Sequence, residues 1–215
     1  SAASDVYKRQ IHASINYVKS QLGNNTEIHL VTYSLIGYFV MPFITLYPDA
    51  VTSIVTLNSG LPAAGKQNHF VDPTPGKPYK WASVETQRSR IMDAPPSGCN
   101  FLEDDDYNEI FDNLRKFQGT YNSELDAWKV PKKDWKIFME PVKDIHTKYK
   151  FRSDARILFL ASQYDTEVPW VNTKKLYDST LAVKDFIVVP DCTHLCRWER
   201  ARHLLYQWTT EFILK

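Results

Sequence analysis

The sequence is poor in glycine and cysteine, and it has no long hydrophobic run. It contains 7 Gly and 3 Cys in 215 residues, and the odd number of cysteines does not suggest a disulfide scaffold. No uninterrupted apolar stretch approaches the roughly 20 residues of a membrane span, so we expect no transmembrane segment. The chain also lacks an excess of charge: its formal net charge is +1 and no basic stripe occurs, which argues against nucleic acid and anionic membranes as partners.

Apolar residues, by contrast, are plentiful. They make up 43% of the sequence and include 11 Phe and 12 Tyr, enough for a sizeable core. A length of 215 residues fits one domain, or one domain with an insertion. One cysteine pair can still form, and the sequon at Asn24 is too short a pattern to place the protein outside the cell. Localisation, in the cytoplasm or after secretion, and oligomeric state therefore stay open.

The first ten residues stand apart from the rest. They read SAASDVYKRQ, which resembles the in-frame translation of a transposase sequencing adaptor. We therefore treat residues 1–10 as an artefact, leave them out of the fold prediction, and expect the true start, with any signal peptide, to be missing. A natural N-terminal tail is the alternative.

From residue 11 the hydrophobic pattern alternates between helix and strand. Strand, tight turn, helix and strand together form the repeating unit of a parallel α/β sheet. Pro42 is expected to kink the second helix or force an irregular turn. The predicted helices are 11–22, 35–47, 170–181 and 201–212, and the predicted strands are 27–33, 51–57, 156–161 and 185–189.

The block 61–150 breaks this rhythm. It opens with a Pro- and Gly-rich loop, and its apolar residues then recur at helical spacing over 107–117 and near 134–150. A helical block inserted between two strands predicts a cap over the core. Three tryptophans in it can line a pocket or pack within the cap: Trp81, Trp128 and Trp135.

Three strand ends carry residues suited to nucleophilic catalysis. Ser34 follows the strand 27–33, Asp165 follows 156–161, and His194 follows 185–189. Ligands of open parallel sheets bind at the carboxyl ends of the strands, so these side chains are expected to meet there. Their order along the chain, Ser, Asp and His, is that of an α/β-hydrolase triad.

Three segments resemble the α/β-hydrolase family. They are the elbow region IHLVTYSLIGYFVMPFITLYPDAVTSIVTLNSG, the acid segment ARILFLASQYDTEVPW and the histidine segment FIVVPDCTHL. The resemblance covers residues 11–60 and 154–215. Within the family, the sequence resembles the serine aminopeptidase and proline iminopeptidase-like branch. It implies an α/β-hydrolase fold, with a partial, mainly parallel sheet and flanking helices. The core would comprise 11–60, with the nucleophile, and 151–215, with the acid and the histidine, separated by the cap.

The same resemblance implies the role of each site residue. Ser34 would be the nucleophile, His194 the general base and then acid, and Asp165 the group that orients the imidazole. The backbone N–H of Leu35 would supply one oxyanion donor, and the second would come from a loop after an earlier strand, outside this chain. The expected activity is serine hydrolysis of a small-molecule ester, amide or peptide through an acyl-enzyme, without cofactor or metal. This chain alone is expected to be inactive, with 27–33 as an aggregation-prone edge strand.

Each of these residues has a plainer interpretation. Ser34 can be a helix N-cap, Glu167 competes with Asp165 as the acid, and His194 can be a structural histidine. The remaining histidines are expected on the surface or in packing: His12, His29, His69, His146 and His203. The run CTHLC, Cys192–Cys196, does not have the spacing of a zinc site, and a disulfide from Cys99 to one of its thiols stays open.

The elbow VTYSLIG departs from the G-x-S-x-G pattern, because Thr32 and Ile36 stand where small residues belong. A β-branched Ile36 is expected to crowd the crossing of helix and strand and to resist positive φ, while Gly37 comes one residue too late unless the turn shifts register. Three accounts remain open: compensating small neighbours, a sequencing error, or lost catalysis. In the last case the protein would be an inactive hydrolase-like binder of a small molecule or a partner. Carbon–halogen or epoxide hydrolysis usually uses an Asp nucleophile, so Ser34 argues against it.

Overall fold

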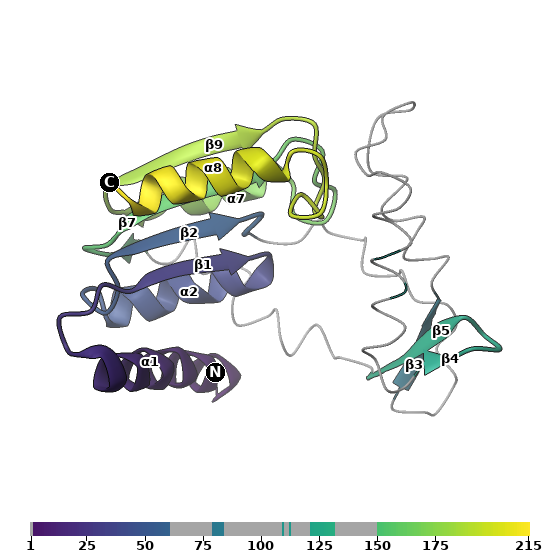
Figure 1. The fold of residues 1–215 in the computed structure, drawn as a ribbon, viewed down its shortest axis with the longest axis horizontal. Coiled ribbons are helices and arrows are strands. Elements are labelled where there is room, and N and C mark those ends of the chain that lie inside the picture. The colour runs from purple at the N-terminus through teal and green to yellow at the C-terminus, as the bar shows by residue number, and fades with distance from the viewer. Residues whose placement is uncertain (1, 61–78, 84–108, 110–111, 113–120, 132–149) are drawn as a thin grey trace.

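A four-stranded parallel sheet forms the centre of the computed structural model, which describes residues 2–60, 79–83, 109, 112, 121–131 and 150–215. Its strands are β1 (His29–Tyr33), β2 (Ser53–Leu57), β7 (Arg156–Ser162) and β9 (Lys184–Val189), in the order β1-β2-β7-β9. Tyr33 pairs with Leu57, and Leu57 pairs with Leu160. This register brings the carboxyl ends of the strands to one edge of the sheet (Figure 1).

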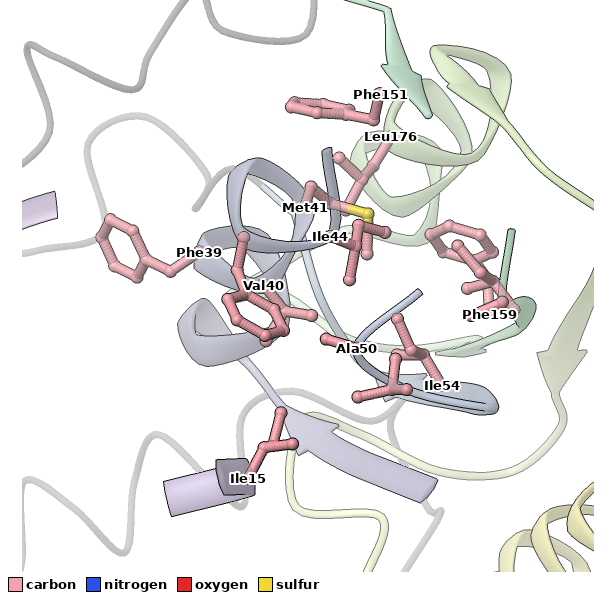
Figure 2. Close-up of a cluster of buried hydrophobic side chains, with 14 residues drawn as sticks. Ile15, Phe39, Val40, Met41, Ile44, Ala50, Ile54, Phe151, Phe159 and Leu176 are labelled. Atoms are coloured by element: carbon pink, nitrogen blue, oxygen red, sulfur yellow. The ribbon is translucent and has the colours of Figure 1, made fainter. Parts of the chain in front are cut away.

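Helices cover both faces of this sheet. On one face, α1 (Ala2–Leu22), α2 (Leu35–Leu46) and α7 (Trp170–Asp178) pack their apolar side chains against Ile54, Ile157 and Phe159 (Figure 2). On the other face, α8 (Arg202–Ile213) packs against Val55 and Leu158, the neighbours of those residues along the strands. Since side chains alternate across a strand, β2 and β7 are buried on both faces.

The predicted core elements agree with the structure to within a few residues, with two differences at helix ends. The helix expected over 170–181 ends at Asp178, because Thr180–Leu181 forms β8, a short strand paired with β6 (Phe151–Arg152). The first helix begins at Ala2, so residues 2–10, which were left out of the fold prediction, continue the same helix as 11–22. The helix α2 runs through Pro42 without ending there.

The described part of the insertion contains a sheet that the sequence pattern does not predict. Strands β3 (Tyr79–Ser83), β4 (Tyr121–Asn122) and β5 (Ala127–Pro131) form an antiparallel sheet in the order β3-β5-β4. The turn between β4 and β5 is held by Asn122, whose Oδ1 accepts hydrogen bonds from the N–H groups of Glu124 and Leu125 at 2.9 and 3.1 Å.

The insertion therefore contains strands in addition to the helical pieces that its sequence pattern predicts. Glu109 and Asp112 are helical and exposed, and the rest of the predicted helix 107–117 lies outside the described residues. Of the predicted helix 134–150, only Lys150 is described, and it is not helical; Trp135 is not described. No helix among the residues that the structure describes is long and apolar enough to cross a membrane.

Candidate active site

Ser34 occupies a strained turn between β1 and α2. Its φ of 57° and ψ of −135° place it in a region that residues other than glycine rarely adopt. Its N–H donates to the carbonyl of Leu57 at 2.8 Å, which fixes the turn to the end of β2. Its side chain makes no capping hydrogen bond to α2, although Ser34 stands at the N-cap position. Ser34 therefore does not act as a side-chain cap of α2.

The hydroxyl instead meets His194. Ser34 Oγ lies 2.9 Å from His194 Nε2, and His194 Nδ1 lies 2.7 Å from Asp165 Oδ2. The Asp165 side chain is fully buried, and that of His194 is 17% exposed. The structure thus brings together the three residues predicted from the strand ends, and it places Asp165, not Glu167, against the imidazole.

The carboxylate of Asp165 determines the tautomer of His194. A carboxylate only accepts hydrogen bonds, so Nδ1 carries the proton and Nε2 is left to accept the serine hydroxyl proton. The other carboxylate oxygen, Oδ1, accepts from the N–H groups of Glu167 and Val168, each at 2.8 Å. These two bonds fix the carboxylate independently of the imidazole.

Leu35 begins α2 immediately after Ser34. Its backbone N–H belongs to the first turn of the helix, whose N–H groups have no acceptor within the helix itself. An oxyanion that forms at a carbonyl carbon attacked by Ser34 would lie near this end of the helix dipole. The role of Leu35 as oxyanion donor stays a prediction.

The close approach of helix and sheet falls on Gly37 and not on Ile36. A Cβ placed on Gly37 would lie 1.9 Å from Ser59 Oγ and 2.8 Å from Thr32 Oγ1, so only glycine fits there. The side chain of Ile36 is 51% exposed. Ile36 does not have a positive φ, whereas Ser34 does. The crowding that we expected at Ile36 is therefore absent from the described part of the elbow, because the tight crossing comes one residue later.

The loop that carries His194 is held by polar groups that the sequence analysis did not single out. The buried carboxylate of Glu199 accepts from the N–H of Thr193 at 2.6 Å and from the Thr193 hydroxyl. Burial raises the pKa of Glu199 above its ordinary value. On the other side of the loop, the hydroxyl of Tyr33 donates to the carbonyl of His194. The sequence itself shows only an acidic residue, Glu199, five positions after the histidine, and its burial is not visible there.

The two cysteines beside His194 are buried free thiols. They belong to the apolar cluster under α8, and burial raises the pKa of Cys196 to about 11 and that of Cys192 further. Cys99 lies outside the described residues. In the parts of the chain that the structure describes, no three His, Cys, Asp or Glu side chains are grouped to hold a metal ion.

The other described histidines lie away from this site. His12 stacks on Tyr47 with ring centroids 4.1 Å apart, and His29 Nδ1 lies 2.7 Å from Ser53 Oγ. His203 is exposed, with Nδ1 2.8 Å from the carbonyl of Arg200. His69 and His146 lie outside the described residues.

Comparison with solved structures identifies the architecture. The chain is similar to a metagenome-derived lipolytic enzyme of the LipS and LipT pair, with a TM-score of 0.60 and 12% identity over 98% of this chain and 73% of that chain. It is also similar to a mutant of the meta-cleavage product hydrolase CumD, with a TM-score of 0.59 and 15% identity over 97% and 72% of the two chains. A third similar structure is the 2-hydroxy-6-oxo-6-phenylhexa-2,4-dienoate hydrolase BphD from Rhodococcus sp. strain RHA1, with a TM-score of 0.58 and 16% identity over 86% and 64%.

At the level of sequence, no family model and no curated protein matches the chain. Sequence identities of 12–16% support a shared fold but do not show a shared activity. The parallel sheet has the order β1-β2-β7-β9 and carries helices on both faces. This architecture agrees with that of the similar structures. The protein has the α/β-hydrolase fold.

Proposed function

We propose that the protein is a serine hydrolase that cleaves an ester or amide bond through an acyl-enzyme on Ser34. One observation carries the proposal: a serine in a strained turn lies within hydrogen-bond distance of a histidine whose other nitrogen meets a buried carboxylate. A serine that only capped α2 would not need this backbone conformation. A histidine that only packed would not need Asp165 at full burial.

The proposed mechanism gives each group a step. Ser34 Oγ attacks the substrate carbonyl carbon while His194 Nε2, 2.9 Å away, takes the hydroxyl proton. The resulting imidazolium then gives this proton to the leaving alcohol or amine, and the acyl group stays on Ser34. Water attacks the acyl-enzyme in the same way and releases the acid. Asp165 stabilises the positive charge that His194 carries in both halves of the reaction.

Esters are the first substrate class to test, since one of the similar structures is named as a lipolytic enzyme. The sequence resemblance to the aminopeptidase-like branch adds amides and short peptides as the second class. Both classes use the same acyl-enzyme step, and the choice between them depends on groups that stabilise the oxyanion and bind the leaving group. Turnover of p-nitrophenyl acyl esters and of aminoacyl p-nitroanilides, measured side by side, separates the two classes.

A covalent fluorophosphonate probe tests the nucleophile directly. The protein expressed from its complete reading frame is expected to be labelled, and Ser34→Ala is expected to abolish labelling. Ser59→Ala is the matched control, because Ser59 is a buried serine near the elbow whose hydroxyl donates to the Leu57 carbonyl and meets no histidine among the described residues. A folded wild-type protein that is not labelled would favour the non-catalytic binding protein. Labelling that survives Ser34→Ala would assign the nucleophile elsewhere.

A further inference from the structure

Asn58 lies at the end of β2, between the strand ends that lead to Ser34 and Asp165. It is 1% exposed and has a φ of 49°, in the left-handed region that Asn tolerates better than most residues. Its backbone N–H donates to the carbonyl of Leu160 at 2.8 Å. The main chain at Asn58 therefore turns while still bonded to β7, which aims its side chain across the carboxyl edge of the sheet.

That side chain joins the acid strand to the histidine loop. Its Oδ1 accepts from the N–H of Ser162 at 2.7 Å, at the end of β7 and three residues before Asp165. Its Nδ2 donates to the carbonyl of His194 at 3.1 Å and lies 3.4 Å from the carbonyl of Thr193 and 3.3 Å from Cys196 Sγ. One buried amide thus contacts both loops that face Ser34.

The amide carries its donor and its acceptor on two separate atoms, so it can reach both loops at once. The oxygen accepts and the nitrogen donates, whereas an ionised carboxylate of the same shape only accepts. Ser162 is buried, so losing Asn58 leaves the N–H of Ser162 without this acceptor in a place where water does not replace it at once.

The carbonyl of His194 is held from a second side. The hydroxyl of Tyr33 donates to the same oxygen, and Tyr33 is the residue before Ser34. The main chain of His194 is therefore bonded to the ends of β1 and β2, the two strands next to the nucleophile. These two bonds fix the position of the His194 backbone, and the bond to Asp165 fixes the orientation of the imidazole ring.

We propose that Asn58 is a positioning residue for the Ser34–His194–Asp165 site, and that its amide fixes the distance between His194 Nε2 and Ser34 Oγ. This inference rests on the proposed serine hydrolase function. Asn58 does not touch the reacting atoms, so its loss changes the rate of the proton transfer step and not substrate affinity. A shift of about 1 Å at a catalytic group lowers the rate about 100-fold.

Asn58→Asp is the sharpest test. It keeps the shape, the tolerance of positive φ and the acceptor for Ser162, and it replaces the donor to the carbonyls of His194 and Thr193 with a carboxylate oxygen, which only accepts. With a p-nitrophenyl ester we expect kcat to fall about 100-fold while KM stays within about 3-fold, and fluorophosphonate labelling to slow by a similar factor. Thr56→Val is the matched control on the same strand, because Thr56 is fully buried and its hydroxyl has no hydrogen-bond partner among the described residues. We expect its labelling rate and kcat to equal those of the wild type.

Tyr33→Phe provides a second variant that does not depend on Asn58→Asp folding. It removes the other donor to the same carbonyl, and we expect kcat to fall about 10-fold at unchanged KM. Labelling and kcat at the wild-type level in a folded Asn58→Asp protein, or in Tyr33→Phe if Asn58→Asp does not fold, would overturn the positioning role alone. Failure of the wild type to react with the probe would overturn both this role and the proposed function.

Discussion

Replacing Gly37 by alanine is expected to destabilise the elbow, because a methyl group has no room at that position. The added Cβ would lie 1.9 Å from Ser59 Oγ, 2.6 Å from Ser59 Cβ and 2.8 Å from Thr32 Oγ1. All three distances are well inside the roughly 3.5 Å of a favourable contact. Ser59 and Thr32 are 0% and 7% exposed, so neither side chain can swing into solvent. Either α2 or the end of β2 must move.

The size of the effect follows from two opposing contributions. Overpacking a core by one methyl group costs about 1–3 kcal/mol, and contacts this short place Gly37→Ala at about 3 kcal/mol. Alanine is more favourable than glycine inside a helix by about 1 kcal/mol, which offsets part of this. We expect a net loss of about 2 kcal/mol in the free energy of unfolding. For a chain of this size that is a fall of about 4–8 °C in Tm.

Thermal and denaturant unfolding, followed by circular dichroism on the protein from the complete reading frame, measure this loss. Ile36→Ala is the control, because half of that side chain is exposed and its removal is expected to change stability by about 0.5 kcal/mol or less. Combining Gly37→Ala with Ser59→Gly removes two of the three short contacts and is expected to show a coupling of about 1 kcal/mol or more. Wild-type stability in Gly37→Ala, or a larger loss in Ile36→Ala, would refute the assignment of the tight crossing to residue 37.

The contacts of four other side chains predict measurable effects. Asp165→Asn keeps an acceptor for the backbone N–H groups but no longer stabilises the Nδ1–H tautomer of His194. We therefore expect kcat for an ester to fall about 10⁴-fold. A fall of less than about 10-fold would exclude the carboxylate from the reaction. Burial raises the pKa of Glu199 above its ordinary value, so the folded state binds this proton more tightly than the unfolded chain and loses stability as pH rises through the raised pKa. Glu199→Gln is expected to flatten this fall in unfolding free energy, and an unchanged slope would contradict the assignment. Lys184 Nζ donates at 2.5 Å to the carbonyl of Tyr177, in α7, and to that of Thr180, in β8, and it lies over the Tyr177 ring. Lys184→Met is therefore expected to lower the unfolding free energy by about 1–2 kcal/mol, against about 0.5 kcal/mol or less for Lys174→Met, whose side chain is 41% exposed. Val31 is 54% exposed and lies on β1, which pairs on one side only among the described residues. Val31→Lys is therefore expected to reduce the aggregation of residues 11–215, measured by light scattering. Unchanged aggregation would point to another surface.

The core is predictable from the sequence because its signals there are local. An apolar run of five residues after a turn predicts a buried strand, and the α/β alternation then predicts that strand ends share one edge of a sheet. These two patterns are sufficient to place Ser34, Asp165 and His194 together at that edge.

The parts that the sequence does not predict depend on tertiary contacts. Short strands such as β4 carry no measurable period, so the antiparallel sheet of the insertion was missed. The motif spacing does not tell whether residue 36 or residue 37 faces the crossing, because that depends on where Ser59 lies. Asn58 resembles an ordinary turn residue in the sequence, since its hydrogen bonds reach residues more than 100 positions away.

The direct pairing of β2 with β7 has a consequence for how the chain can vary. Leu57 and Leu160 are neighbours in the sheet although the whole insertion separates them along the sequence. The entropy of closing such a loop rises only with the logarithm of its length, so a fourfold longer connection costs only about 1.2 kcal/mol more. Residues 61–150 can therefore lengthen, shorten or be exchanged over evolution at little thermodynamic penalty, while the strand ends that hold Ser34, Asp165 and His194 keep their places.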